Sequence, residues 1–272
     1  SLTGVRILVA EDNEYNQIVV NDTLESLIPD VFIEIAENGL IALDRARSND
    51  YDIILMDAQM PEMDGLDATR AIRKLEDSKK AEIPIIALTA SVHKADIDKC
   101  LDSGMNDFVP KPFTREELLG TLSKNYSSDH PKSSTGTQVG TTQEPKKETP
   151  IATVPSVKNG AVTNLDFLRE FAEGDEGRMK KYVGMYLKLL PGNIDKIKGA
   201  SDRSDNELLV KVLHSMRPHL NYMGMKISAE LAGNIENAVR EEEDQSFVPE
   251  AAQTILKHCE KSEIELNEWL SK

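Results

Sequence analysis

The stretch Asp52–Arg70, which reads DIILMDAQMPEMDGLDATR, decides the fold of the first half of this chain. It opens with a short run of branched apolar residues, Ile53–Met56, and that run ends at the acidic side chain of Asp57. Turn-forming residues follow, and an amphipathic segment of helical period begins at Gly65. A buried strand, a polar turn and a helix in this order are the repeating unit of a parallel α/β sheet.

The same alternation extends over residues 1–126. Apolar runs typical of buried strands occupy Val5–Ala10, Val31–Ala36, Ile53–Met56, Ile83–Ala90 and Phe108–Val109. Segments of helical period occupy Tyr15–Leu27, Gly39–Arg47, Gly65–Leu75 and Val92–Leu101, and a last one follows a capping residue, Thr114. Five strands alternating with five helices predict a doubly wound, five-stranded parallel sheet.

The character of the chain changes after residue 126. Residues 127–162 contain four prolines, no aromatic residue and no apolar periodicity, so they predict a flexible linker. Residues 163–272 predict an antiparallel helical bundle. Its expected helices are Asp166–Glu173, Arg178–Leu190, Asn193–Ala200, Asn206–Met223, Lys226–Arg240 and Val248–Trp269, with breaks at Gly174, Pro191-Gly192, Ser201–Asp205 and Gly224.

Composition excludes several classes of protein. The 272 residues carry a formal net charge of −15, and residues 1–126 hold 24 acidic against 13 basic side chains. Such a balance disfavours direct binding to nucleic acid. No apolar run is long enough to span a bilayer, and the N-terminus has no signal-peptide layout. Two distant cysteines argue against a disulfide framework, so we expect a cytoplasmic setting.

Polar side chains follow the predicted strands at the edge where ligands of parallel sheets bind. They are Glu11, Asp12, Asp57, Thr89 and Lys111. Converging carboxylates indicate a hard divalent cation such as Mg²⁺, while the lysine and threonine suit phosphate oxygens. Together they predict a phosphoryl-accepting aspartate. The alternative is that acidic residues end these strands only because aspartate is common in turns.

These residues stand in motifs that resemble response-regulator receiver domains, especially those of hybrid sensor kinases. The motifs are ILVAEDNEYNQ, DIILMDAQMPEMDGLDATR, IIALTA and FVPKPF, and the resemblance covers residues 4–126. It implies that Asp57 is the phosphoacceptor and Lys111 the phosphate-contacting lysine. It also implies a cis peptide at Lys111–Pro112. The metal ligands would be Glu11, mostly through water, Asp12, Asp57 and the carbonyl of Gln59, and the switch and phosphate-support positions Thr89, Phe108 and Ala90.

Two histidines share the predicted helix Asn206–Met223, and a helical wheel separates them. Its apolar stripe consists of Leu209, Val212, Leu213, Met216, Leu220 and Met223. His219 lies at the edge of this stripe and is expected to pack. His214 lies on the open face with Arg217 three residues later, where a guanidinium could balance a phosphoryl group on the imidazole. A solvated surface histidine is the alternative. His93 and His130 are expected to be solvated at the surface, and His258 to be packed or exposed without a chemical role.

A second resemblance connects residues 163–272 to histidine-containing phosphotransfer (HPt) domains. It rests on LDFLREFAEGDEGRMKKYVGMYLKLLPGNIDKIKGA and LLVKVLHSMRPHLNYMG. It implies that His214 is phosphorylated, that Arg217 replaces the usual lysine, and that Gly224 is a later motif glycine. Pro218 departs from the pattern, which has glycine there to let a partner approach. A proline removes a helical hydrogen bond and is expected to kink the helix, so a degenerate HPt domain stays an alternative.

The two resemblances together predict a phosphorelay. A histidine kinase would phosphorylate Asp57 with Mg²⁺, Asp57 would pass the group to His214, and His214 would load a downstream receiver. No glycine-rich nucleotide-binding region is present in the sequence, so we do not expect ATP binding or autophosphorylation. The chain is expected to be the C-terminal part of a hybrid histidine kinase. A standalone receiver–HPt protein would have the same sequence features and is the alternative. A phosphorylation-switched binding module, with His214 inactive, is the alternative function; a DNA-binding regulator is a weaker one.

Overall fold

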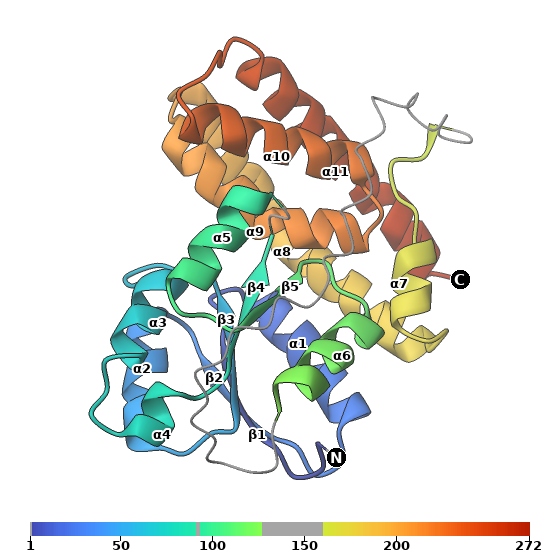
Figure 1. Ribbon diagram of the computed structural model, residues 1–272. Helices are drawn as coiled ribbons and strands as arrows, with labels where there is room; N and C mark the ends of the chain where they lie inside the picture. Colours follow the sequence, from blue (N-terminus) through green and yellow to red (C-terminus); the bar gives the residue numbers. More distant parts are fainter. Residues whose placement is uncertain (1, 91–92, 127–159) are drawn as a thin grey trace.

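The computed structural model describes residues 2–90, 93–126 and 160–272, so the predicted linker at residues 127–159 lies outside the described part. The described residues form two units (Figure 1). The α/β unit comprises residues 2–126, and the helical unit comprises residues 160–272.

The α/β unit is built on one parallel sheet, as the sequence predicted. Its strands are β1 (Arg6–Ala10), β2 (Phe32–Ala36), β3 (Ile53–Asp57), β4 (Ile85–Thr89) and β5 (Asp107–Pro110). Their order is β2-β1-β3-β4-β5, and every pairing is parallel. The order in which strands are added across the sheet therefore reverses between β1 and β3, and the crevice outside the carboxyl ends of these two strands is where such sheets bind ligands.

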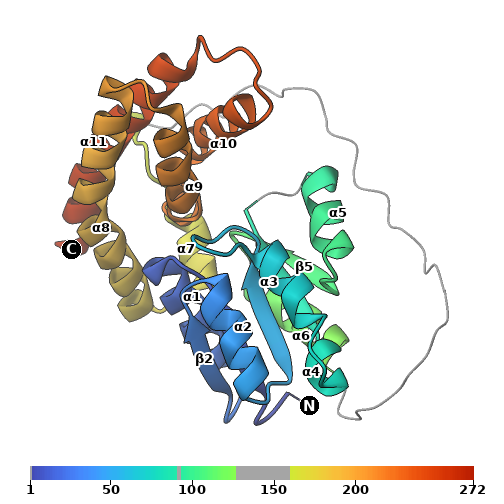
Figure 2. The same cartoon turned by 90° about the vertical axis from the view of Figure 1, so that its left-hand side faces the viewer.

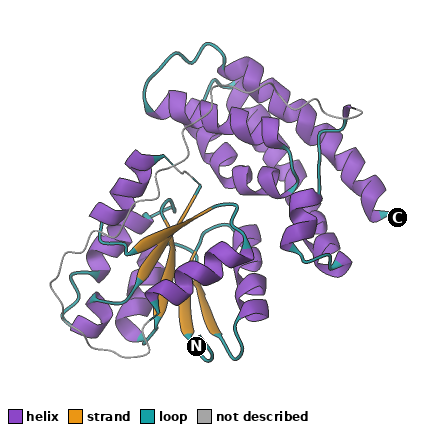
Figure 3. Ribbon diagram, turned by 45° about the vertical axis from the view of Figure 1, so that its right-hand side comes forward, coloured by secondary structure: helices purple, strands orange, loops and turns teal. Residues whose placement is uncertain are grey.

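Helices cover both faces of this sheet (Figure 3). They are α1 (Glu14–Leu27), α2 (Gly39–Ser48), α3 (Gly65–Ile72), α4 (Ser78–Ala81), α5 (Lys94–Asp102) and α6 (Arg115–Asn125). Alternate residues of each strand serve the two faces: Ile7 and Val9 join the cluster under α1 and α6, while Leu8 and Ala10 join the cluster under α2, α3 and α5. Burial on both faces explains why the strands read as continuous apolar runs.

The helical unit consists of one short and four long helices among the described residues. They are α7 (Asp166–Phe171), α8 (Glu176–Asp202), α9 (Asn206–Tyr222), α10 (Lys226–Arg240) and α11 (Val248–Leu270). The six apolar residues of the predicted α9 stripe are all buried. The first described residues of this unit are held to α11, because Val162 N–H and Thr163 Oγ1 both donate to the Glu265 carboxylate.

The structure differs from the sequence prediction at three places. Helix α8 continues through Pro191 and Gly192, where a break was expected. Both residues are exposed, while Leu190 and Ile194 on either side are buried, so packing of the two halves outweighs the hydrogen bond that proline removes. The short helix α4 was not predicted, and residues 160–162, assigned to the linker, are ordered against α11.

The two units pack against each other through a continuous hydrophobic cluster (Figure 2). Residues of α1 and α6 and residues of α7, α8 and α9 belong to the same cluster. Ion pairs surround it, with Lys181 Nζ 2.5 Å from Asp22 and an Arg115 amino group 3.2 Å from Glu173. Within the described ranges, no helix is both long and apolar enough to cross a membrane.

Candidate functional site

Three carboxylates meet at the carboxyl ends of β1 and β3. Glu11 and Asp12 follow β1, and Asp57 is the last residue of β3. One ligand oxygen from each lies within 4.8 Å of the others. Glu11 is fully buried and Asp57 nearly so, whereas Asp12 is exposed. The order of the sheet thus brings together side chains that are 45 residues apart in sequence.

Lys111 neutralises part of this charge. Its Nζ lies 2.5 Å from Glu11 Oε2 and 2.6 Å from Asp57 Oδ2, and its side chain is only 5% exposed. The two carboxylates raise the pKa of Lys111 although burial acts against its charge, so the ammonium stays protonated. Burial raises the pKa of Glu11 to about 7, and burial together with Asp57 raises that of Asp12.

The donor set fits a hard divalent cation. Three carboxylates converging with one ammonium leave an uncompensated negative charge, and Mg²⁺ prefers such oxygen ligands. Glu11 Oε1 already accepts from Asn13 N–H and Asn16 Nδ2, which leaves Asp12 and Asp57 more available. The N–H of Gln59 donates to Asp57 Oδ1 at 3.1 Å, so this residue lies beside the phosphoacceptor position.

The other predicted receiver positions differ in their distance from this site. Thr89 ends β4, is nearly buried, and lines the same cavity as Asp57, as does Ala90. Phe108 lies in β5, half-buried, and packs against the cluster under α2, α3 and α5 instead of lining the cavity. The Lys111–Pro112 peptide is cis, as the resemblance implied.

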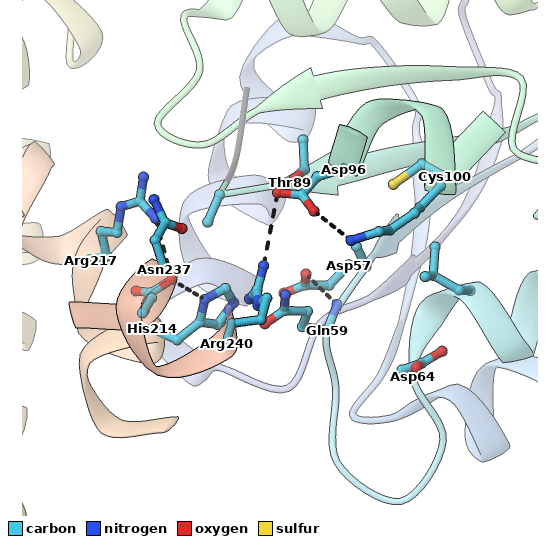
Figure 4. Close-up of a pocket in the computed structure, with 15 residues that line it drawn as sticks. Asp57, Gln59, Asp64, Thr89, Asp96, Cys100, His214, Arg217, Asn237 and Arg240 are labelled. Atoms are coloured by element: carbon cyan, nitrogen blue, oxygen red, sulfur yellow. Dashed lines mark hydrogen bonds and ion pairs between the residues drawn. The ribbon is translucent and has the colours of Figure 1, made fainter. Parts of the chain in front are cut away.

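His214 of the helical unit faces the carboxylate site. Helix α9 carries His214 and Arg217, and both line a cavity of about 390 Å³ together with Asp57 and Thr89. Figure 4 shows these side chains around the cavity, contributed by the two units. The imidazole is about one-fifth exposed. The sequence placed the histidine on an open helix face, and in the structure this residue lines a cavity together with Asp57 of the same chain.

Three residues of α10, Glu236, Asn237 and Arg240, complete the helical side of the cavity and were missed by the sequence analysis. Glu236 is 3% exposed, and its Oε2 lies 3.2 Å from His214 Nδ1 and 3.3 Å from Arg217 Nη1. Its Oε1 is buried with no hydrogen-bond partner among the described residues. Arg240 approaches Asp96 of α5 at 3.9 Å. No local pattern marks Glu236, because it reaches His214 only through the packing of α10 on α9.

Pro218 lies inside α9, which continues through it to Tyr222. The proline is buried and, with Asp12, Asn13 and Lys211, lines a second cavity beside the site. The position where the resemblance implies a glycine for close approach is therefore in the contact between the units. His219 is 2% exposed and packs, as expected, whereas His258 bonds to Ser228 Oγ in another part of the unit.

Comparisons with known proteins agree with this geometry for the α/β unit. Residues 7–123 match the family described as Response regulator receiver domain. The chain is 38% identical over 122 residues to the two-component response regulator ORR41 of Oryza sativa subsp. japonica, covering 44% of this chain and 93% of that protein. A crystal structure of the receiver domain of sensor histidine kinase PA1611 from Pseudomonas aeruginosa PAO1, with a coordinated magnesium ion, is 41% identical. It covers 45% of this chain and 98% of that chain, with a TM-score of 0.42.

Several similarities extend into the helical unit. The aerobic respiration control sensor protein ArcB of Escherichia coli (strain K12) is 26% identical over 237 residues, or 87% of this chain. The chain spans 28% of the length of that sensor. It spans 4–8% of three hybrid signal transduction histidine kinases of Dictyostelium discoideum, with 40–42% identity over 130–138 residues.

Proposed function

Because the chain belongs to the response regulator receiver family through residues 7–123, we propose that Asp57 accepts a phosphoryl group and passes it to His214. One observation carries this proposal: the two side chains, 157 residues apart in sequence, line the same cavity. A carboxylate and an imidazole that face each other beside two arginines and a lysine suit the movement of a phosphoryl group between them.

The proposal assigns the helical unit to the HPt class and gives it partners. A histidine kinase would supply the phosphoryl group, and the receiver domain of a downstream response regulator would take it from His214. The similarity to the sensor protein ArcB across most of the chain supports a place within a longer sensor protein. The domain limits proposed are 1–126 for the receiver, 127–162 for the linker and 163–272 for the HPt domain.

Phosphoryl uptake needs one bond to form and one to break. An Asp57 carboxylate oxygen attacks phosphorus, and the P–N bond to the donor's histidine breaks, so that the electron pair returns to the donor imidazole. Lys111 Nζ, already 2.6 Å from Asp57 Oδ2, neutralises charge on the phosphoryl oxygens, and the Thr89 hydroxyl is close enough to the cavity to donate to one of them. Bound Mg²⁺, held by Asp12, Asp57, the Gln59 carbonyl and water on Glu11, would supply further charge neutralisation.

Transfer from Asp57 to His214 uses the residues that the helical unit contributes to the cavity. His214 Nε2 attacks phosphorus while the P–O bond to Asp57 breaks and its carboxylate is restored. Glu236 Oε2 holds the Nδ1–H of the same ring, which fixes the tautomer whose Nε2 lone pair is free to attack. Arg217 then balances the charge of the phosphorylated imidazole.

The direct test is to load the full chain with acetyl phosphate and Mg²⁺ and to locate phosphate by intact mass. We expect a base-labile phosphate on Asp57 and an acid-labile phosphate on His214. Asp57→Ala should remove both species, and His214→Ala should remove only the acid-labile one. Loading by a phosphorylated donor domain provides a second route to the same measurement.

A different result would support the alternative function. If phosphate stays on Asp57 under both loading routes, and His214→Ala changes nothing, phosphotransfer to His214 is refuted. The helical unit would then be a docking module whose contact with the receiver responds to phosphorylation of Asp57.

Replacing Glu236 by glutamine is expected to slow transfer from Asp57 to His214 by about ten- to a hundredfold. The amide keeps the volume but loses the negative charge that stabilises the Nδ1–H form of the ring. Rapid-quench measurement of acid-labile phosphate checks this, with loading of Asp57 unchanged. Glu230→Gln, an exposed acid on the same helix, is the matched control. Equal transfer rates for the two variants would contradict the assigned role.

Magnesium affinity is expected to depend on pH near neutrality. The pKa of Glu11 is raised to about 7, so protonation below that pH removes one negative charge from the site. Cation binding favours the deprotonated form, and affinity should therefore be full above pH 7 and fall by up to tenfold per pH unit below it. Isothermal titration with MgCl₂ at pH 8 and pH 6 measures this. Glu11→Gln should bind Mg²⁺ more weakly at pH 8 and lose most of the pH dependence.

A further inference from the structure

The first turn of α1 is enclosed by the helical unit. Tyr15 lies three residues after the metal-site residue Asp12 and is completely buried. Three rings of the helical unit surround it, with centroid separations of 4.3 Å for His219, 6.2 Å for Tyr222 and 6.3 Å for Tyr182. A tyrosine on the first turn of a surface helix would be solvated in an isolated α/β unit, so this burial results from contact with the helical unit.

His219 makes the polar part of this contact. Its Nε2 lies 3.1 Å from Asn13 Oδ1, the same oxygen that caps α1 by accepting from Asn16 N–H. In the opposite direction, Asn13 Nδ2 donates to the Ser215 carbonyl at 3.4 Å. Asn13 therefore exchanges hydrogen bonds with two successive turns of α9, which fixes the position of that helix along its own axis and not merely its proximity.

We propose that His219 is the positioning residue that seats the helical unit on the start of α1 and thereby sets His214 opposite Asp57. The two histidines are five residues apart on one rigid helix, so a shift of His219 moves His214 with it. The surrounding ion pairs, such as Lys181 with Asp22, are partly exposed, so each stabilises the contact only weakly and none defines a unique alignment. The buried, directional hydrogen bond between His219 and Asn13 does define a single alignment.

The contact around His219 accommodates only the neutral form of its imidazole. Burial and the nearby ammonium of Lys111 lower the pKa of His219 to about 3. The titratable groups near the ring are Tyr15 of α1, which packs on it, and Lys111 from the loop after β5, while Tyr222 of its own helix packs on Tyr15. Burial raises the pKa of both tyrosines, so they stay uncharged. A protonated His219 would face a like charge without a carboxylate bonded to it.

Docking must therefore weaken in mild acid. A released histidine has its ordinary pKa near 6.5, whereas the docked one is at about 3. The docked state binds fewer protons, so docking is at full strength above pH 6.5 and weakens by up to tenfold per pH unit below it. The relevance to phosphotransfer rests on the proposed function, but docking itself is measured on unphosphorylated protein. If docking does not depend on pH, the result therefore says nothing against the proposed phosphotransfer, which has its own test.

The experiment is single-molecule fluorescence energy transfer on the full chain. Dyes are placed on Lys79→Cys and Lys257→Cys, two exposed positions on α4 and α11, while both native cysteines are buried. We expect the ratio of open to closed molecules to rise about tenfold between pH 7.5 and pH 5.5. His219→Gln keeps a neutral donor for Asn13 and should stay closed at pH 7.5 without that rise. His219→Ala should raise the ratio already at pH 7.5.

His258→Gln is the matched control, because it removes a titrating histidine of the same unit that bonds to Ser228 within the helical unit. It should keep the pH response of the unmodified chain. Circular dichroism at both pH values verifies that every variant is folded. The proposal is overturned if His219→Gln shows the same pH response as the unmodified chain, or if His219→Ala remains equally closed.

Discussion

Replacing Lys111 by methionine is expected to lower the rate of phosphoryl uptake by Asp57 at least about a hundredfold. The Lys111 ammonium lies 2.5 Å from Glu11 and 2.6 Å from Asp57, where charge develops on the transferring group. Removal of one such preorganised charged donor from a buried site costs about 10²–10³ in rate. Methionine preserves most of the volume, so the loss reports charge and not a cavity. Rapid-quench loading with acetyl phosphate measures it.

The same variant should bind Mg²⁺ more tightly than the unmodified chain at pH 8. Without the ammonium, the three carboxylates repel each other with no protein cation to compensate, so a divalent ion gains affinity. Faster loading, or weaker Mg²⁺ binding, would show that Lys111 acts mainly by holding the carboxylates in place. Lys124→Met, an exposed lysine of α6 that pairs with Asp107, is the control and should change neither quantity.

Gly65→Ala is expected to destabilise the α/β unit by about 2–3 kcal/mol and to impair phosphorylation of Asp57. A Cβ at this first residue of α3 would lie 1.9 Å from the backbone oxygen of Asp57 and 2.9 Å from the Met56 side chain. The obstacle is the backbone of β3, which cannot rotate away, so α3 or the phosphoacceptor strand must shift. Urea denaturation measures the first effect and acetyl phosphate loading the second.

Gly120→Ala provides the matched comparison. Gly120 lies within α6, and a Cβ there would have no atom within 4 Å. The same substitution should stabilise by up to about 1 kcal/mol, because alanine loses less conformational freedom in a helix than glycine. If both variants had equal stability, the tight contact behind Asp57 would not exist in solution.

The sheet could be predicted from sequence because parallel strands are buried on both faces. Ile53–Asp57 and Ile85–Thr89 are fully buried apart from their terminal polar residues, which gives each a continuous apolar run and a polar end. The convergence of Glu11, Asp12, Asp57 and Lys111 follows from strand order alone. Helix limits were less predictable: Pro191 suggested a break in α8, and tertiary packing overrode it.

The contact between the units was not predictable. Tyr15 belongs to a motif that identifies the α/β unit, and nothing in its neighbours indicates that another part of the chain will bury it. Glu236 reaches His214 from the next helix, 22 residues later, through packing that no local periodicity encodes. Pro218 was interpreted as an obstacle to docking, yet it is buried where the units meet. The prediction failed because one substitution reveals neither the shape of a surface nor the partner that packs on it.

The burial of Tyr15 by the helical unit limits the access of other proteins to Asp57 and His214. A surface that is already covered cannot bind a second protein, so an incoming donor that approaches Asp57 over the start of α1 must wait until the helical unit has left. In the same way, a downstream acceptor can reach His214 only after that histidine has turned away from Asp57. Loading, internal transfer and delivery would then occupy one surface in turn, and the rate at which the two units separate would set the highest rate of signal flow.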